Sequence, residues 1–215
     1  DGIKTIPWWA YPLWVILTFW ITLTIHELGH LLAFVFQGVK IRGLYLHMIS
    51  IYRSPKGWRM KFKYKLWFLL GGFVVPDLGV IADDQTYEKR VKQFSTSLIV
   101  APIVSIVFLS LTIVTFLVLN LVGVDPHLLG RFTLFTVYTI LLSILYIRSF
   151  NISNASFYGD FVAYKKMKED PVFQLTQLAQ YTMFSLHPSN ETDLYMFNRM
   201  KTMIQTIDLK SSLFY

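Results

Sequence analysis

The sequence predicts a mainly α-helical membrane protein with three transmembrane helices, a membrane-associated β-hairpin loop after the first helix, and a C-terminal soluble helical tail. Hydrophobic residues fill 54% of the 215 positions and charged residues only 15%, against about a quarter charged in an ordinary soluble domain. Three long apolar runs and one segment of strictly alternating residues supply the rest of this prediction.

The three apolar runs cover residues 10–36, 93–124 and 132–147. Each reaches or approaches the roughly 20 helical residues that a bilayer core requires, the third only when its flanks are included. We therefore expect helices at about 10–37, 94–124 and 131–150. These helices and the first loop form a predicted membrane-embedded core over residues 1–164.

The loop between the first two runs contains the segment "WRMKFKYK", Trp58 to Lys65, in which aromatic or apolar residues alternate with basic ones. Period two indicates a strand with one apolar and one basic face. The turn sequence "SPKG" precedes it, and the strand-like "LYLHMISIY" comes before that turn. We predict a β-hairpin over about residues 41–76 that rests on the membrane, with the basic residues at lipid headgroups. A ribbon that binds nucleic acid or a protein partner is the alternative.

Basic residues are distributed unevenly along the chain. Of the 20 Lys and Arg, eleven lie between Lys40 and Lys92 and seven from Arg148 onward. The positive-inside rule then predicts a multi-pass cell-membrane protein whose N-terminus lies outside, with loop 38–93 and the C-terminus in the cytoplasm. The net charge of +7 fits anionic lipid at least as well as nucleic acid, so we expect the lipid bilayer and no nucleic acid as partner.

Residues 165–215 are predicted to form a cytoplasmic helical tail. Apolar residues recur there at helical spacing after "HPSNE", which indicates one amphipathic helix. They are Leu194, Phe197, Met200, Ile204 and Ile207.

Polar residues interrupt the first apolar run at "HELGH", residues 26–30. His26 and His30 are four apart, so both imidazoles project from one helix face and can ligate one ion, with Glu27 beside them. This is the HExxH arrangement, in which two His bind zinc and the Glu serves as general base. Two hydrogen-bonded core histidines are the alternative, but a carboxylate buried in lipid costs at least ~2.5 kcal/mol, which a divalent cation offsets.

A catalytic zinc site needs a third protein ligand, and the chain has no Cys, so that ligand is His, Asp or Glu. Asp160 follows the third apolar run and is preceded by Gly159, which could let the chain fold back to the depth of the histidines. A helix cap is the other interpretation of Asp160. Three other carboxylates remain as alternative ligands: Asp77, Asp83 and Asp84.

These residues resemble the site-2 protease family of intramembrane zinc metalloproteases. The similarity rests on "HELGHLLA" in the first helix, on "LLGGFVVPD" (69–77) in the loop, and on "APIVS" (101–105) in the second helix, where the family has Gly-Pro-x-x-Asn. The pair Phe150-Asn151, followed by Gly159-Asp160, stands where the family has an Asn-x-x-Pro stretch and then Leu-Asp-Gly.

The resemblance implies a Zn²⁺ metalloendopeptidase, in a bacterial membrane, that hydrolyses transmembrane or signal-peptide-like substrates. It implies Glu27 as the catalytic base and His26, His30 and Asp160 as the metal ligands. The substrate-binding residues it implies are Gly71, Gly72, Phe73, Val74 and Ser105. A non-catalytic membrane adaptor or immunity protein that retains the fold is the alternative function, and a metal transporter is a third.

Overall fold

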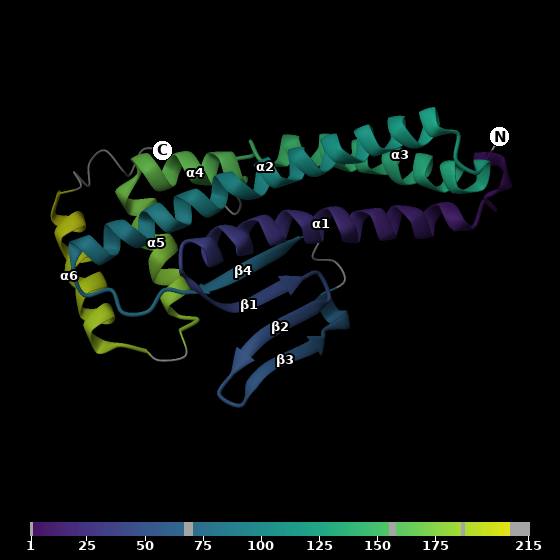
Figure 1. Ribbon diagram of the computed structural model, residues 1–215. Helices are drawn as coiled ribbons and strands as arrows, with labels where there is room; N and C mark the ends of the chain where they lie inside the picture. Colours follow the sequence, from purple (N-terminus) through teal and green to yellow (C-terminus); the bar gives the residue numbers. More distant parts are fainter. Residues whose placement is uncertain (1, 67–70, 155–157, 186–187, 207–215) are drawn as a thin grey trace.

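The computed structural model describes residues 2–66, 71–154, 158–185 and 188–206 (Figure 1). Within these ranges three helices are long and apolar enough to cross a membrane, namely α1 (Ala10–Phe36), α2 (Asp84–Val122) and α3 (Pro126–Ser149). They lie side by side and each contacts the other two. A short 3₁₀ helix, η1 (Gly2–Thr5), packs on α3. The predicted fold class, a mainly α membrane protein, is therefore confirmed.

Helices α2 and α3 begin earlier than the apolar runs suggested, at 84 rather than 94 and at 126 rather than 131. The caps explain both starts, since Asp83 accepts a hydrogen bond from Thr86 N at 2.6 Å and Asp125 accepts from the first turn of α3. With 39 residues, α2 is about 58 Å long, whereas the hydrocarbon core of a bilayer is about 30 Å thick. Its charged first turns therefore extend beyond the apolar span.

The loop after α1 forms a four-stranded antiparallel sheet, which is larger than the predicted hairpin. Its order is β3-β2-β1-β4, with bounds Lys40–Leu46 (β1), Ile49–Ser54 (β2), Gly57–Phe62 (β3) and Gly72–Asp77 (β4). The "SPKG" turn joins β2 to β3. The strand-like "LYLHMISIY" is broken at His47, whose φ of 50° turns the chain between β1 and β2. Leu69 and Leu70 lie outside the described residues.

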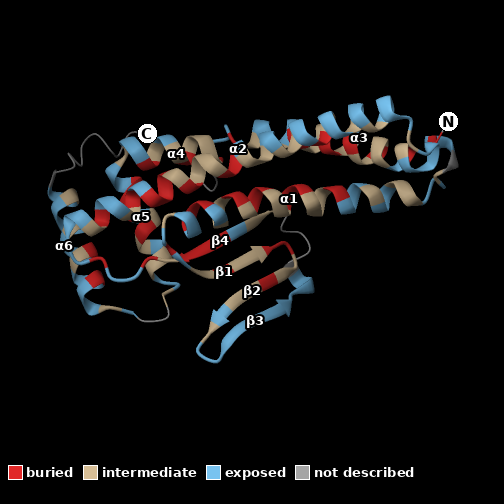
Figure 2. Cartoon of the chain, viewed as in Figure 1, coloured by how far each residue is buried: buried red, intermediate tan, exposed pale blue. Residues whose placement is uncertain are grey.

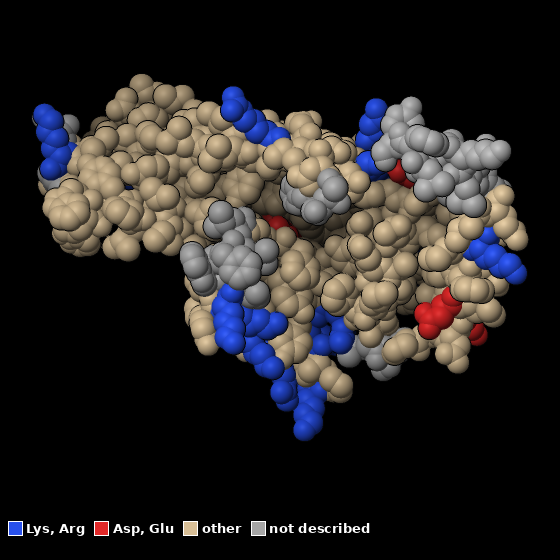
Figure 3. Space-filling model, turned by 180° about the vertical axis from the view of Figure 1, so that it is seen from behind, with Lys and Arg blue, Asp and Glu red and all other residues tan. Residues whose placement is uncertain are grey.

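The sheet lies alongside the second half of α1, and the outermost strand, β3, projects away from the helices (Figure 1). Every residue of β3 is exposed (Figure 2). Basic side chains gather on this projecting part of the sheet (Figure 3); they are Lys56, Arg59, Lys61, Lys63 and Lys65. The strand is thus amphipathic as expected, with neither face covered by the described part of the chain.

After α3 the chain forms α4 (Asp160–Glu169), α5 (Pro171–Thr182) and α6 (Asn190–Thr206), where the sequence indicated one amphipathic helix. Met167 and Leu178 are fully buried in the same hydrophobic cluster as Phe34 and Phe94 of the membrane helices. The tail is therefore packed on the core, and the predicted boundary at 164/165 falls inside α4. Ile207 lies outside the described residues.

Candidate metal centre

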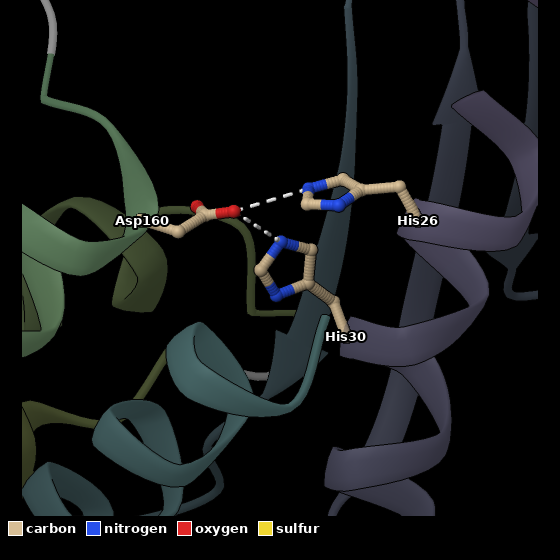
Figure 4. A group of neighbouring side chains, drawn as sticks. All are labelled: His26, His30 and Asp160. Atoms are coloured by element: carbon tan, nitrogen blue, oxygen red, sulfur yellow. Dashed lines mark ion pairs between the residues drawn. The ribbon is translucent and has the colours of Figure 1, made fainter. Parts of the chain in front are cut away.

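Two elements far apart in the sequence bring three ligand-type side chains together (Figure 4). The middle of α1 supplies His26 and His30, and the first residue of α4 supplies Asp160. The carboxylate Oδ2 of Asp160 lies 3.1 Å from Nε2 of His26 and 3.7 Å from Nε2 of His30. One ligand atom from each residue falls within 4.8 Å of the other two, so these residues form a group that could hold a metal ion.

The turn before α4 explains how Asp160 reaches the histidines. Gly159 packs so closely on the end of α3 that a Cβ on it would overlap the backbone of Ser149 and Phe150. Backbone hydrogen bonds from Gly159 N to Ile152 O (2.8 Å) and from Phe161 N to Phe150 O (3.1 Å) fix this approach. The Asp160 side chain points at the two rings (Figure 4).

The other carboxylates considered as third ligand lie elsewhere and have other partners. Asp77 accepts from Gly79 N at 3.2 Å, Asp83 caps α2, and Asp84 pairs with Arg199 at 2.6 Å. None of them belongs to the His-His-Asp group found in the described part of the chain.

The chemistry of this donor set fits a cation. In the tautomer with a proton on Nδ1, each imidazole directs the Nε2 lone pair toward Oδ2 of Asp160, so two nitrogen lone pairs and an anionic oxygen converge. Such a convergence is electrostatically unfavourable unless a positive charge lies between the groups. Zinc with N and O ligands at 2.0–2.2 Å would separate tetrahedral ligand atoms by about 3.4 Å, close to the distances of 3.1 and 3.7 Å between Oδ2 of Asp160 and the two Nε2 atoms.

Glu27 lies beside this group and is 4% exposed. Its Oε2 has no hydrogen-bond partner among the described residues. The start of β4 packs directly on it, because a Cβ on Gly72 would lie 2.7 Å from Cγ and 2.8 Å from the carboxyl carbon of Glu27. A buried carboxylate with an unused oxygen is expensive to keep, which indicates a role in chemistry or binding.

A cavity of about 1020 Å³ opens beside the three ligand-type residues and Glu27. Figure 3 shows a hollow between the sheet and the helices with acidic atoms at its base. Gly71 and Gly72 line the cavity on the sheet side. Apolar residues of α1 and α3 form much of the remaining wall: Val15, Ile16, Phe19, Leu142 and Leu145.

The remaining residues predicted to bind substrate lie away from the cavity lining. Phe73 stacks on Tyr45 with ring centroids 4.4 Å apart, and Val74 is buried in the hydrophobic cluster. Ser105 is bonded to His26, with 3.0 Å between Oγ and Nδ1.

Three further residues lie at the site, and the sequence predicted no role in it for any of them. The rings of Tyr146 and Phe150 stack on His26, and both residues line the cavity. His47 also lines the cavity and packs edge-on against Trp20. Aromatic residues on α3 and a histidine in a strand turn give no periodic signal, so only tertiary structure reveals them.

The fold and the site together define a membrane protein with a buried His-His-Asp group beside a buried glutamate. The family model described as peptidase family M50, the site-2 protease family, matches residues 14–211. The chain therefore belongs to peptidase family M50, and this membership implies a membrane metallopeptidase. No curated protein and no solved structure matches the chain.

Proposed function

We propose that this protein is an intramembrane zinc metalloendopeptidase that cleaves membrane-anchored or short hydrophobic peptides. The observation that carries the proposal is the convergence of His26, His30 and Asp160 beside Glu27 within the apolar part of α1. If the two histidines were only structural, they would not require the carboxylate of Asp160 beside them. They would also not require the unsatisfied carboxylate of Glu27 at the same depth.

In this proposal His26, His30 and Asp160 would hold Zn²⁺. When bound, the metal would supply an activated water and polarise the scissile carbonyl. Glu27 accepts the proton of the attacking water and returns it to the leaving amine as general acid. The unpartnered Oε2 of Glu27 suits this task, since no side chain of the described residues forms a hydrogen bond with it.

Substrate class follows from the cavity. Its walls on α1 and α3 are apolar, which suits a hydrophobic segment, and strand β4 forms one edge of the sheet. A helical substrate hides its carbonyls in hydrogen bonds and must unwind before attack, and pairing with an edge strand holds an extended chain through main-chain bonds. We propose that the backbone of residues 71–74 binds the substrate in this way, and we assign Ser105 to His26 rather than to substrate.

The proposed orientation places the N-terminus outside and the sheet and tail on the cytoplasmic side. The N-terminus and the tail lie at opposite ends of the helix bundle (Figure 1). The basic residues of β3 lie on the part of the sheet that projects from the side of the bundle (Figure 3). In the proposed orientation anionic headgroups of the inner leaflet would attract them.

The test is zinc content and peptide cleavage by the detergent-purified protein, with a fluorogenic transmembrane peptide as substrate. The wild type should hold one zinc per chain, and His26→Ala and Asp160→Asn should lose zinc and cleavage together. Glu27→Gln should keep the zinc and lose cleavage. A wild type without zinc after reconstitution would refute the catalytic proposal. If Glu27→Gln kept its biological activity, an adaptor or immunity function would replace it.

A further inference from the structure

Helices α1 and α2 approach each other very closely at the level of the histidines. A Cβ on Gly29 would lie 2.7 Å from the Cα of Ala101, so only glycine permits this separation. Ser97 and Ser105 are four residues before and after Ala101 and therefore share its helix face. The close approach brings both hydroxyls within hydrogen-bond distance of the imidazoles on α1.

The contact at His30 fixes the position of the ring proton. Nδ1 of His30 lies 3.0 Å from the backbone carbonyl oxygen of Ser97 and 3.2 Å from its hydroxyl. A carbonyl oxygen only accepts hydrogen bonds, so Nδ1 must be the donor. The neutral ring then presents the lone pair of Nε2 to Asp160.

At His26, Nδ1 is again the donor, but its acceptor is a side-chain hydroxyl instead of a backbone carbonyl. The Ser105 hydroxyl donates to the carbonyl oxygen of Ala101 at 3.1 Å. With its hydrogen used in this bond, Oγ accepts from Nδ1 of His26 at 3.0 Å. Phe150 stacks on the same ring at a 14° interplanar angle, which limits rotation of the ring plane.

We propose that Ser97 and Ser105 are positioning residues through which α2 sets the affinity of the site for a divalent cation. They hold both imidazoles in the tautomer and orientation that directs Nε2 toward Asp160. This inference rests on the proposed function. The two positions differ in one respect: Ser105 acts through its hydroxyl, whereas Ser97 retains its carbonyl acceptor when the side chain is removed.

The experiment measures zinc affinity of the purified full-length chain by competition with a chelator of known affinity. Partners of metal-bound histidines are worth about 10- to 100-fold in metal affinity. We therefore expect Ser105→Ala to weaken zinc binding within this range and Ser97→Ala to weaken it less. Ser105→Thr, which keeps a hydroxyl, should restore most of the affinity.

Ser110→Ala is the matched control. The Ser110 hydroxyl donates to Ile106 O at 2.9 Å on an exposed face of the same helix, so this variant removes the same intrahelical bond without touching an imidazole. Its zinc affinity should equal that of the wild type. The melting temperatures of all variants in excess chelator separate loss of positioning from loss of folding.

Three outcomes are distinguishable. Weakened zinc binding in Ser105→Ala with an unchanged melting temperature of the metal-free protein supports the inference. Equal affinities in Ser105→Ala and Ser110→Ala would overturn it while leaving the proposed function intact. If neither the wild type nor any variant binds zinc, the proposed function itself fails, and the inference fails with it.

Discussion

Gly72 lies directly against Glu27, with the position of a Cβ on Gly72 only 2.7 Å from Cγ of Glu27. The same Cβ would be 2.7 Å from the carbonyl oxygen of Tyr45 on the neighbouring strand. The backbone of β4 therefore holds one side of the Glu27 carboxyl group, and a side chain here has no room without moving it. The position of the Glu27 carboxyl group therefore depends on the backbone at the start of β4.

Gly72→Ala should displace Glu27 and lower cleavage strongly while leaving zinc content unchanged, because the three atoms nearest to the added Cβ belong to Glu27 and Tyr45 and not to the metal-binding residues. A misplaced catalytic group can cost roughly 100-fold in rate. The measurement is kcat for a fluorogenic peptide together with zinc per chain. Gly71→Ala is the comparison, since a Cβ on Gly71 meets nothing within 4 Å, and it should lose much less. An equal fall in kcat in the two variants would show that the loss of cleavage does not come from the contact between residue 72 and Glu27.

Gly29→Ala should destabilise the bundle, because its Cβ would fall 2.7 Å from the Ala101 backbone and force α1 and α2 apart. Overpacking of this kind costs about 1–3 kcal/mol. Thermal unfolding in detergent measures the effect. Val35→Ala on the same helix is the control, because Val35 is 47% exposed and its truncation should change stability far less. A melting temperature of Gly29→Ala equal to that of the control would contradict the close packing.

The sequence was most informative where residue type and spacing have a direct physical meaning. Long apolar runs predicted the three membrane-crossing helices, and the turn "SPKG" predicted the junction that joins β2 and β3. The spacing of His26 and His30 placed two imidazoles on one helix face, where the structure has them. In each case a single local rule decides the outcome.

Features that depend on long-range packing were not predictable. The apolar run begins only at residue 93, so the charged segment before it gives no helical signal in the sequence. In the structure this segment is the first part of α2, and Asp83 caps it. The turn at His47 contains no Gly or Pro, the residues that usually indicate a turn in a sequence. Ser97 is an ordinary serine in an apolar run, and the family resemblance assigned Ser105 to substrate. Only the approach of α2 to Gly29 makes both serines partners of the imidazoles.

Arg199 should be the main polar anchor of α6 on α2. Its guanidinium lies 3.9 Å from the centroid of Tyr87 and 2.6 Å from the carboxylate of Asp84, which also accepts from the Tyr195 hydroxyl at 2.5 Å. Because Asp84 is largely exposed, we expect Arg199→Ala to weaken docking by only ~1 kcal/mol. Hydrogen exchange of α6 measures this. Lys201→Ala, an exposed residue of the same helix, is the control, and equal exchange in both variants would rule out the anchor.

Because of Tyr181 in α5, the stability of the protein should change with pH in the alkaline range. Burial raises the pKa of Tyr181 to about 12, and the carboxylates of Glu27 and Asp160 contribute to the shift. An unfolded chain releases this proton near pH 10, whereas the folded protein keeps it. Between about pH 10 and 12 the folded state therefore binds more protons than the unfolded state, and the free energy of unfolding falls as pH rises, in total by ~3 kcal/mol.

Chemical denaturation at pH 8, 10 and 11.5 tests this dependence, with Tyr181→Phe beside the wild type. Below pH 10 the tyrosine is neutral in both states, so the comparison at pH 8 gives only the packing cost of losing the hydroxyl. Above pH 10 the wild type should lose stability more steeply than Tyr181→Phe, because the variant has no proton to release at this position. Parallel curves over the whole range would mean that Tyr181 ionises as easily in the folded protein as in the unfolded chain.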